Sequence, residues 1–157
     1  MTRLAATLIG LLVLAFGIAA PAHADEPDLH PDIAYALAAL PGGIPTGTTS
    51  AEWPDLGITY TIETRSARAV GTCATNLICA YRTAGLGGAK VTFSGCSTWS
   101  TTAFGGVGSV ANARTSGWAN ARNSSGTVLK HVPYGTWADV PAGVTSIACG
   151  GNGITSA

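Results

Sequence analysis

The stretch ICAYRTAGLGGAKVTFSGCSTW, residues 78–99, carries the clearest pattern in this sequence. Tyr81 is followed seven residues later by Gly88, and a short apolar run then leads to Cys96. The stretch has no acid, no histidine and no marked nucleophile, so it is a poor candidate for chemistry. Its β-branched and aromatic residues on either side of a glycine-rich segment instead predict two short strands, at 77–82 and 89–94.

The same pattern continues toward the C-terminus. Short runs rich in β-branched residues alternate there with Gly, Ser and Asn, at spacings of about 10 to 15 residues. No segment after residue 70 has the apolar period of a helix. The sequence therefore predicts an all-β sandwich or barrel over residues 71–157. The further strands that we expect cover residues 107–113, 116–122, 127–132 and 144–149.

The N-terminus is typical of a signal peptide, which we assign to residues 1–24. Arg3 precedes an apolar run from residue 4 to residue 20, and Ala22-His23-Ala24 is a small-x-small cleavage site. An uncleaved membrane anchor is the alternative, but the run is slightly short for a span and the cleavage site favours removal. We therefore expect a secreted, extracellular chain that starts at Asp25.

Residues 25–70 form an acidic N-terminal arm in our interpretation. They hold seven acids and two bases (net −5), whereas residues 71–157 hold five bases and one acid (net +4). We expect a short helix at 31–40, with Pro31 in its first turn and Asp28 or His30 near its cap. A Pro/Gly/Thr connector then precedes a half-buried strand at 56–63. The opposite charges are either two solvated surfaces or a sign that the arm docks on the basic segment.

Four cysteines remain in the exported chain, and an even number favours two disulfides. Three pairings are possible, and the sequence does not choose among them. We expect Cys73–Cys79, which closes a short loop, and Cys96–Cys149, which ties a central strand to the C-terminal region. The absence of a CxxC motif and an oxidising compartment disfavour a zinc site.

Catalysis needs titratable groups that lie together. Residues 71–157 contain one carboxylate, Asp139, and one histidine, His131. A two-carboxylate glycosidase site is therefore impossible within this segment, and no GxSxG motif marks a serine nucleophile. We expect the protein not to be an enzyme and to use no metal and no cofactor.

A carbohydrate-binding face is an alternative use of the exported β segment. Aromatic rings can stack on sugars, although in small β domains they more often fill the core or cover an edge. The candidate residues are Trp99, Trp118, Tyr134 and Trp137.

Residues 81–88 (YRTAGLGG) resemble the aromatic-x₆-glycine hairpin of the βγ-crystallin Greek key, in which the glycine takes a backbone shape that side chains resist. Residues 108–112 (GSVAN) and 144–147 (VTSI) are similar to the serine-bearing segments of such a key, and residues 118–126 to the start of a second key. The resemblance implies a double Greek-key sandwich that follows the short helix–strand arm. The structural residues that it implies are Tyr81, Gly88, Ser109, Trp118 and Ser146.

The order of short motifs more closely resembles peptidase inhibitor family I36, small secreted actinobacterial proteins with a βγ-crystallin-like fold. The motifs are CAY (79–81), TFSGC (92–96), SVAN (109–112) and SGW (116–118). This resemblance implies inhibition of secreted proteases, including those of the thermolysin type. A rigid exposed loop would enter the protease cleft in an extended form.

The founding inhibitor of that family carries its reactive bond beside a cysteine in a second small disulfide loop. This chain has no cysteine between Cys96 and Cys149, so no residue inherits that role by position. We expect the inhibitory loop to be the segment between the first two cysteines instead. Its residues are Ala74, Thr75, Asn76, Leu77 and Ile78. The alternative function is a non-inhibitory structural or cell-surface interaction module.

The remaining expectations concern ligands and partners. The segments GGVG (105–108) and PAGV (141–144) carry no acid where βγ-crystallin domains bind calcium, and a hard cation needs oxygen ligands and negative charge. We therefore expect no calcium binding at micromolar concentrations. Without clustered Lys and Arg, the charge of residues 71–157 does not indicate nucleic-acid binding. We expect a monomer that has no membrane partner after cleavage and that binds a thermolysin- or subtilisin-type protease.

Overall fold

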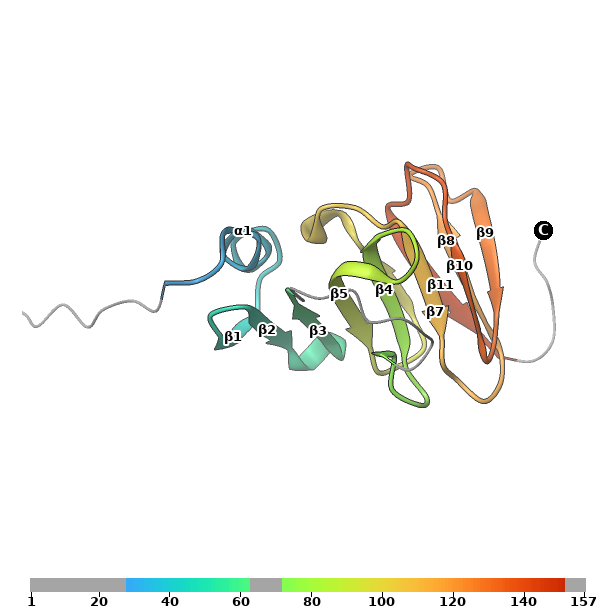
Figure 1. Cartoon of the computed structure of the whole chain (residues 1–157), viewed down its shortest axis with the longest axis horizontal. Helices are drawn as coiled ribbons and strands as arrows, with labels where there is room; N and C mark the ends of the chain where they lie inside the picture. The colour runs from blue at the N-terminus through green and yellow to red at the C-terminus, as the bar shows by residue number, and fades with distance from the viewer. Residues whose placement is uncertain (1–27, 63–71, 152–157) are drawn as a thin grey trace, which may run out of the picture.

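The computed structural model describes residues 28–62 and 72–151 (Figure 1). Two antiparallel sheets, of seven and four strands, form a sandwich-like arrangement with one short N-terminal helix. The mostly β architecture agrees with the predicted fold class. The expected signal peptide, residues 1–24, lies outside the described residues and stays a prediction.

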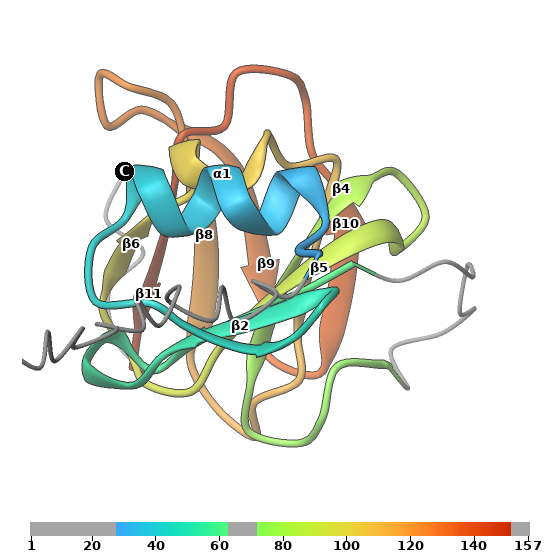
Figure 2. The ribbon, with the colours of Figure 1, turned by 90° about the vertical axis from the view of Figure 1, so that its left-hand side faces the viewer.

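Helix α1 (Pro31–Ala39) is the short helix predicted at 31–40. The backbone N–H of Asp32 donates to Nδ1 of His30 over 3.2 Å, so His30 caps the helix, and Pro31 occupies the first turn. Ile33 and Ala36 are fully buried, which fixes the face that packs on the rest of the protein. Figure 2 shows the helix lying across one end of the sandwich.

The larger sheet has the strand order β1-β2-β3-β5-β4-β7-β10. Every neighbouring pair is antiparallel, and β3 pairs with β5 in the register Ile58↔Phe93. The arm and the C-terminal segment therefore share one sheet. The strands are β1 (Ile44–Gly47), β2 (Ser50–Trp53), β3 (Ile58–Thr61), β4 (Ile78–Thr83), β5 (Gly87–Phe93), β7 (Ser109–Asn112) and β10 (Thr136–Asp139).

The smaller sheet has the order β6-β11-β8-β9. Its strands are β6 (Thr98–Ser100), β11 (Ser146–Gly150), β8 (Trp118–Arg122) and β9 (Val128–Pro133). Strand β6 follows β5 in the chain but pairs with β11, and β10 follows β9 but pairs with β7. The two halves β4–β7 and β8–β11 thus each lend their third strand to the other sheet.

Strands β4, β5, β7, β8, β9 and β11 overlap the six strands predicted after residue 71, whereas β1, β2, β6 and β10 were not predicted. These four are only three or four residues long, and β1, β6 and β10 lie at sheet edges. An edge strand packs on one neighbour and needs less apolar alternation. The strand expected at 56–63 starts at Ile58, because Pro54–Leu56 form a 3₁₀ turn.

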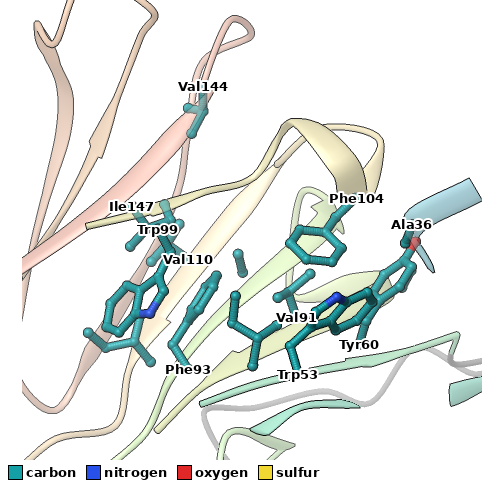
Figure 3. Close-up of a cluster of buried hydrophobic side chains, with 14 of the residues drawn as sticks. Ala36, Trp53, Tyr60, Val91, Phe93, Trp99, Phe104, Val110, Val144 and Ile147 are labelled. Carbon is teal, nitrogen blue, oxygen red and sulfur yellow. The ribbon is translucent and has the colours of Figure 1, made fainter. Parts of the chain in front are cut away.

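The core lies between the sheets (Figure 3). The rings of Phe93 on β5 and Trp99 on β6 stack with their centroids 4.7 Å apart and so join the two sheets. Near α1, Trp53 and Tyr60 pack on Phe104 at centroid distances of 5.6 and 5.1 Å. Residues of the arm therefore complete this core. The division into an arm (25–70) and a separate domain (71–157) stays a prediction.

Candidate functional site

Two disulfides each hold one surface segment of the described residues. Cys73 pairs with Cys79 and Cys96 with Cys149, as expected from the sequence, with Cα–Cα distances of 5.8 and 5.3 Å. The first bridge is buried, whereas Cys96 is exposed and Cys149 half-buried. The first bridge closes the candidate inhibitory loop, and the second ties the segment before β6 to β11.

The candidate inhibitory loop is a tight turn. The Leu77 N–H donates to the Ala74 carbonyl over 3.2 Å, and Asn76 has a positive φ of 70°, as the third residue of a type II turn requires. The Asn76 N–H also donates to the Ala113 carbonyl over 2.9 Å. Ala74, Thr75 and Asn76 are exposed, so this short apex is what the loop presents.

Ile78 does not belong to the presented surface. It is the first residue of β4 and is fully buried in the core between the sheets, so a partner cannot reach its side chain. Leu77 is half-buried against the cluster formed by the first disulfide, Tyr81 and its neighbours. The bulky apolar residue that the loop was expected to present is thus only partly available, as Leu77.

The β4–β5 hairpin, which contains Tyr81 and Gly88, is fixed by hydrogen bonds from buried side chains. Gly88 has a φ of +76°, which a side chain would strain. The buried Ser109 hydroxyl donates to the Thr83 carbonyl over 2.7 Å and accepts from the Leu86 N–H over 3.0 Å. Tyr81 is buried, and its hydroxyl lies 2.7 Å from Thr72 Oγ1. The Tyr81–Gly88 segment is therefore structural.

The corresponding residues of the second half are arranged differently. Trp118 is half-buried, and its ring lies so close to Gly150 that a Cβ there would come within 2.3 Å of it. Ser146 begins β11 and faces Ser100 and Arg122 across the two strand pairs. Both residues thus lie in the smaller sheet: Ser146 begins β11, and Trp118 on β8 pairs with Gly150 at the end of β11.

The four candidate sugar-stacking aromatics do not share a face. Trp99 is only 6 % exposed because it stacks inside the core, whereas Tyr134 and Trp137 are 53 % and 42 % exposed. The ring of Trp118 lies 6.3 Å from the ring of His131, centroid to centroid. A single aromatic platform of four rings is therefore not formed.

The candidate titratable groups are engaged separately. Asp139 Oδ1 accepts from the Gly85 N–H over 2.7 Å, while His131 Nδ1 lies 2.7 Å from Asn120 Oδ1. Within residues 28–62 and 72–151, no three His, Cys, Asp or Glu side chains are grouped so that they could hold a metal ion. No helix in this described part is long and apolar enough to cross a membrane.

Arg82 joins the arm to the rest of the molecule. Its guanidinium donates to Asp32 Oδ2 over 2.6 Å, to the Phe104 carbonyl over 3.3 Å and to the Tyr60 hydroxyl over 3.5 Å. Burial raises the pKa of Tyr60 above its ordinary value, and the charge of Arg82 partly opposes this rise. Of the two interpretations of the charge pattern, this ion pair between Asp32 and Arg82 favours docking of the arm on the basic segment.

The sequence analysis did not predict one exposed candidate surface. Residues 94–98 (SGCST) are all exposed, and the second disulfide anchors them to β11. The Cys149 N–H donates to the Ser97 carbonyl over 2.9 Å, which fixes the end of the segment. The Ser and Gly residues around Cys96 were the sequence feature that could have indicated an exposed segment.

Comparisons of the whole chain with protein-family models, curated proteins and solved structures found no match. The fold and the surface together define a mostly β protein that two disulfides stabilise.

Proposed function

We propose that this protein is a secreted, βγ-crystallin-like member of the type represented by peptidase inhibitor family I36, and that it binds a protease through a disulfide-held surface loop. The exchange of the third strand between the two halves, with β6 and β10 each in the opposite sheet, supports the double Greek-key interpretation. The contacts of Ser109 with the β4–β5 hairpin add to it. Two disulfides are consistent with an oxidising, extracellular location.

Binding is favoured over catalysis because the two titratable groups singled out in residues 71–157 are engaged in separate hydrogen bonds. Asp139 accepts from a hairpin N–H, and His131 lies against Asn120. A surface loop with a fixed conformation favours binding to a partner protein, because a rigid loop loses little conformational entropy when it binds.

The observation that carries the loop assignment is the turn at residues 74–77. The disulfide at its base and the hydrogen bond from Asn76 to Ala113 hold its exposed apex in one conformation. The apex is small, so it would contact the rim of a protease cleft while Leu77 packs behind it. The adjoining exposed segment 94–98 offers a second, separately anchored surface.

The test is residual activity of a thermolysin-type and of a subtilisin-type protease, each titrated with the oxidised chain 25–157. We expect stoichiometric loss of activity for at least one of them. Thr75→Asp places a charge on the exposed apex and should weaken inhibition by about tenfold. Ala84→Asp, at an equally exposed turn of the β4–β5 hairpin, is the matched control and should inhibit like the original protein.

Equal inhibition by both variants would show that this loop does not contact the protease. Segment 94–98 would then be the next surface to alter. The second candidate function, a non-inhibitory interaction module, is favoured by the folded backbone of the turn, because inhibitors enter clefts in extended form. Survival of the protein with no inhibition of either protease would establish that alternative over the first.

A further inference from the structure

A pocket of about 270 Å³ lies beside the candidate loop. It lies where β2 ends, between the Pro54–Gly57 turn and Leu77. Polar side chains of Glu52, Thr59, Thr92 and Ser94 form part of its lining. Leu77 therefore belongs both to the loop and to the pocket wall.

The sheet register explains why these polar groups are together. Glu52 on β2 faces Thr59 on β3, and Thr59 faces Thr92 on β5. Directly paired residues of antiparallel strands project from the same face, with Cβ atoms about 5 Å apart. The neighbouring row in that register, Trp53, Ile58 and Phe93, projects into the core. The Glu52 row thus lies on the outer face of the sheet.

The pocket lining carries one charged side chain, and its charge is negative. Glu52 is the only charged residue among those that line the pocket, and its exposed carboxylate has no hydrogen bond or ion pair within the described residues. The Ser94 hydroxyl donates to the Gly57 carbonyl over 3.2 Å, which leaves its own oxygen free to accept. Pro54 and Leu77 supply apolar walls. The pocket lining therefore combines hydrogen-bond acceptors with hydrocarbon.

We propose that this pocket binds the side chain of an arginine or lysine of a protein partner. The aliphatic stem would lie along Leu77 and Pro54, and the cationic head would reach the Glu52 carboxylate and the neighbouring hydroxyls. Glu52 lines the pocket and the exposed Asp55 lies on the turn beside it, so these two acids attract a cation to the pocket. The proposal deepens the proposed function and rests on it for the identity of the partner as a protein held at the adjoining loop.

The experiment is an NMR titration of ¹⁵N-labelled, oxidised chain 25–157 with Nα-acetyl-arginine amide. Nα-acetyl-norleucine amide, which has an aliphatic side chain without the charge, is the matched probe. We expect saturable shifts of the Glu52, Thr59 and Leu77 amides with the arginine probe, and binding of the norleucine probe weaker by about fivefold. Glu52→Gln should weaken arginine binding by about fivefold, whereas Asp55→Asn, an exposed acid on the adjacent turn, should leave it within about twofold.

Equal effects of the two substitutions, or shifts spread over all acidic residues, would overturn the proposal in favour of general attraction to the acidic end. Equal binding of both probes would overturn it as well. The protease titration separates the two proposals. If the protein binds arginine but inhibits neither protease, the proposed function is wrong and the pocket proposal stands. If it inhibits a protease but the pocket amides do not shift, the pocket proposal is wrong and the proposed function stands. The amide spectrum of Glu52→Gln reports whether that variant is folded. Because Glu52 is exposed, we expect the variant to fold.

Discussion

The Ser109 hydroxyl bonds two residues of the β4–β5 hairpin from a position 26 residues beyond Thr83 in the chain. Replacing it with alanine would leave the N–H of Leu86 without its partner in a buried environment. We expect Ser109→Ala to lower the free energy of unfolding by about 1–3 kcal/mol, measured by denaturant titration. Ser97→Ala, at an exposed position, should change it by less than about 0.5 kcal/mol. Similar losses for both variants would contradict this role of Ser109.

Tyr60 makes stability depend on pH in the alkaline range. Burial raises the pKa of its hydroxyl above the ordinary value of 10.0, so the folded state holds this proton more tightly than the unfolded state does. The contribution is therefore fully present below pH 10.0 and is lost as the pH rises through the folded-state pKa. We expect the original protein to lose more stability than Tyr60→Phe between neutral pH and pH above 10.0, in unfolding curves measured along that range. Parallel curves for the two proteins would exclude this linkage.

At the scale of elements, the arm contributes to the core as well as to the surface. Trp53 of β2 is 1 % exposed, donates from Nε1 to the Leu40 carbonyl over 2.8 Å and packs on Phe104. Strand β3 also covers the edge of β5. Elements of residues 28–62 therefore hold the fold together, and their removal would expose a sheet edge.

Trp53→Ala in the full chain tests this contribution. Because the side chain is fully enclosed, we expect a loss of about 3–5 kcal/mol in the free energy of unfolding. Leu56→Ala is the control on the next turn, where the side chain is 43 % exposed, and it should cost less than about 1 kcal/mol. Thermal and denaturant unfolding would measure both. A small loss for Trp53→Ala would mean that the arm is dispensable for stability.

At the scale of the whole molecule, the two disulfides differ in access. Cys73 and Cys79 are 5 % and 0 % exposed, whereas Cys96 is exposed, and Nη1 of Arg114 lies 3.0 Å from Sγ of Cys149. A cation beside Cys149 favours its thiolate as a leaving group. We expect a small dithiol reductant to open Cys96–Cys149 first, with a loss of about 4 kcal/mol of stability from the longer closed loop.

Alkylation of the freed thiols followed by peptide mass spectrometry measures the order of reduction. Arg114→Gln should slow the opening of Cys96–Cys149 and leave Cys73–Cys79 unchanged. Earlier opening of the buried Cys73–Cys79 bridge would show that exposure does not set the order.

The candidate loop shows how far sequence reasoning reached toward the site. The cysteines placed the loop between residues 73 and 79, and the structure closes it with that pair. Ile78 was included in the candidate loop because it lies between Cys73 and Cys79 in the sequence. Its side chain is buried because it begins β4, a central strand of the larger sheet, and packs in the core between the sheets. Glu52 carried no signal, because the residues that form its pocket come from different strands.

The sequence by itself determined the mostly β class, the short helix and seven of the strands, because propensity, turn residues and apolar period act over a few neighbouring residues. It also determined that two disulfides were possible. Only the tertiary structure decided their partners, the strand exchange of β6 and β10, and the joining of β3 to β5. The physical reason is that strand pairing depends on contacts between residues far apart in the chain. Short edge strands such as β6 are stabilised by their partners more than by their own sequence.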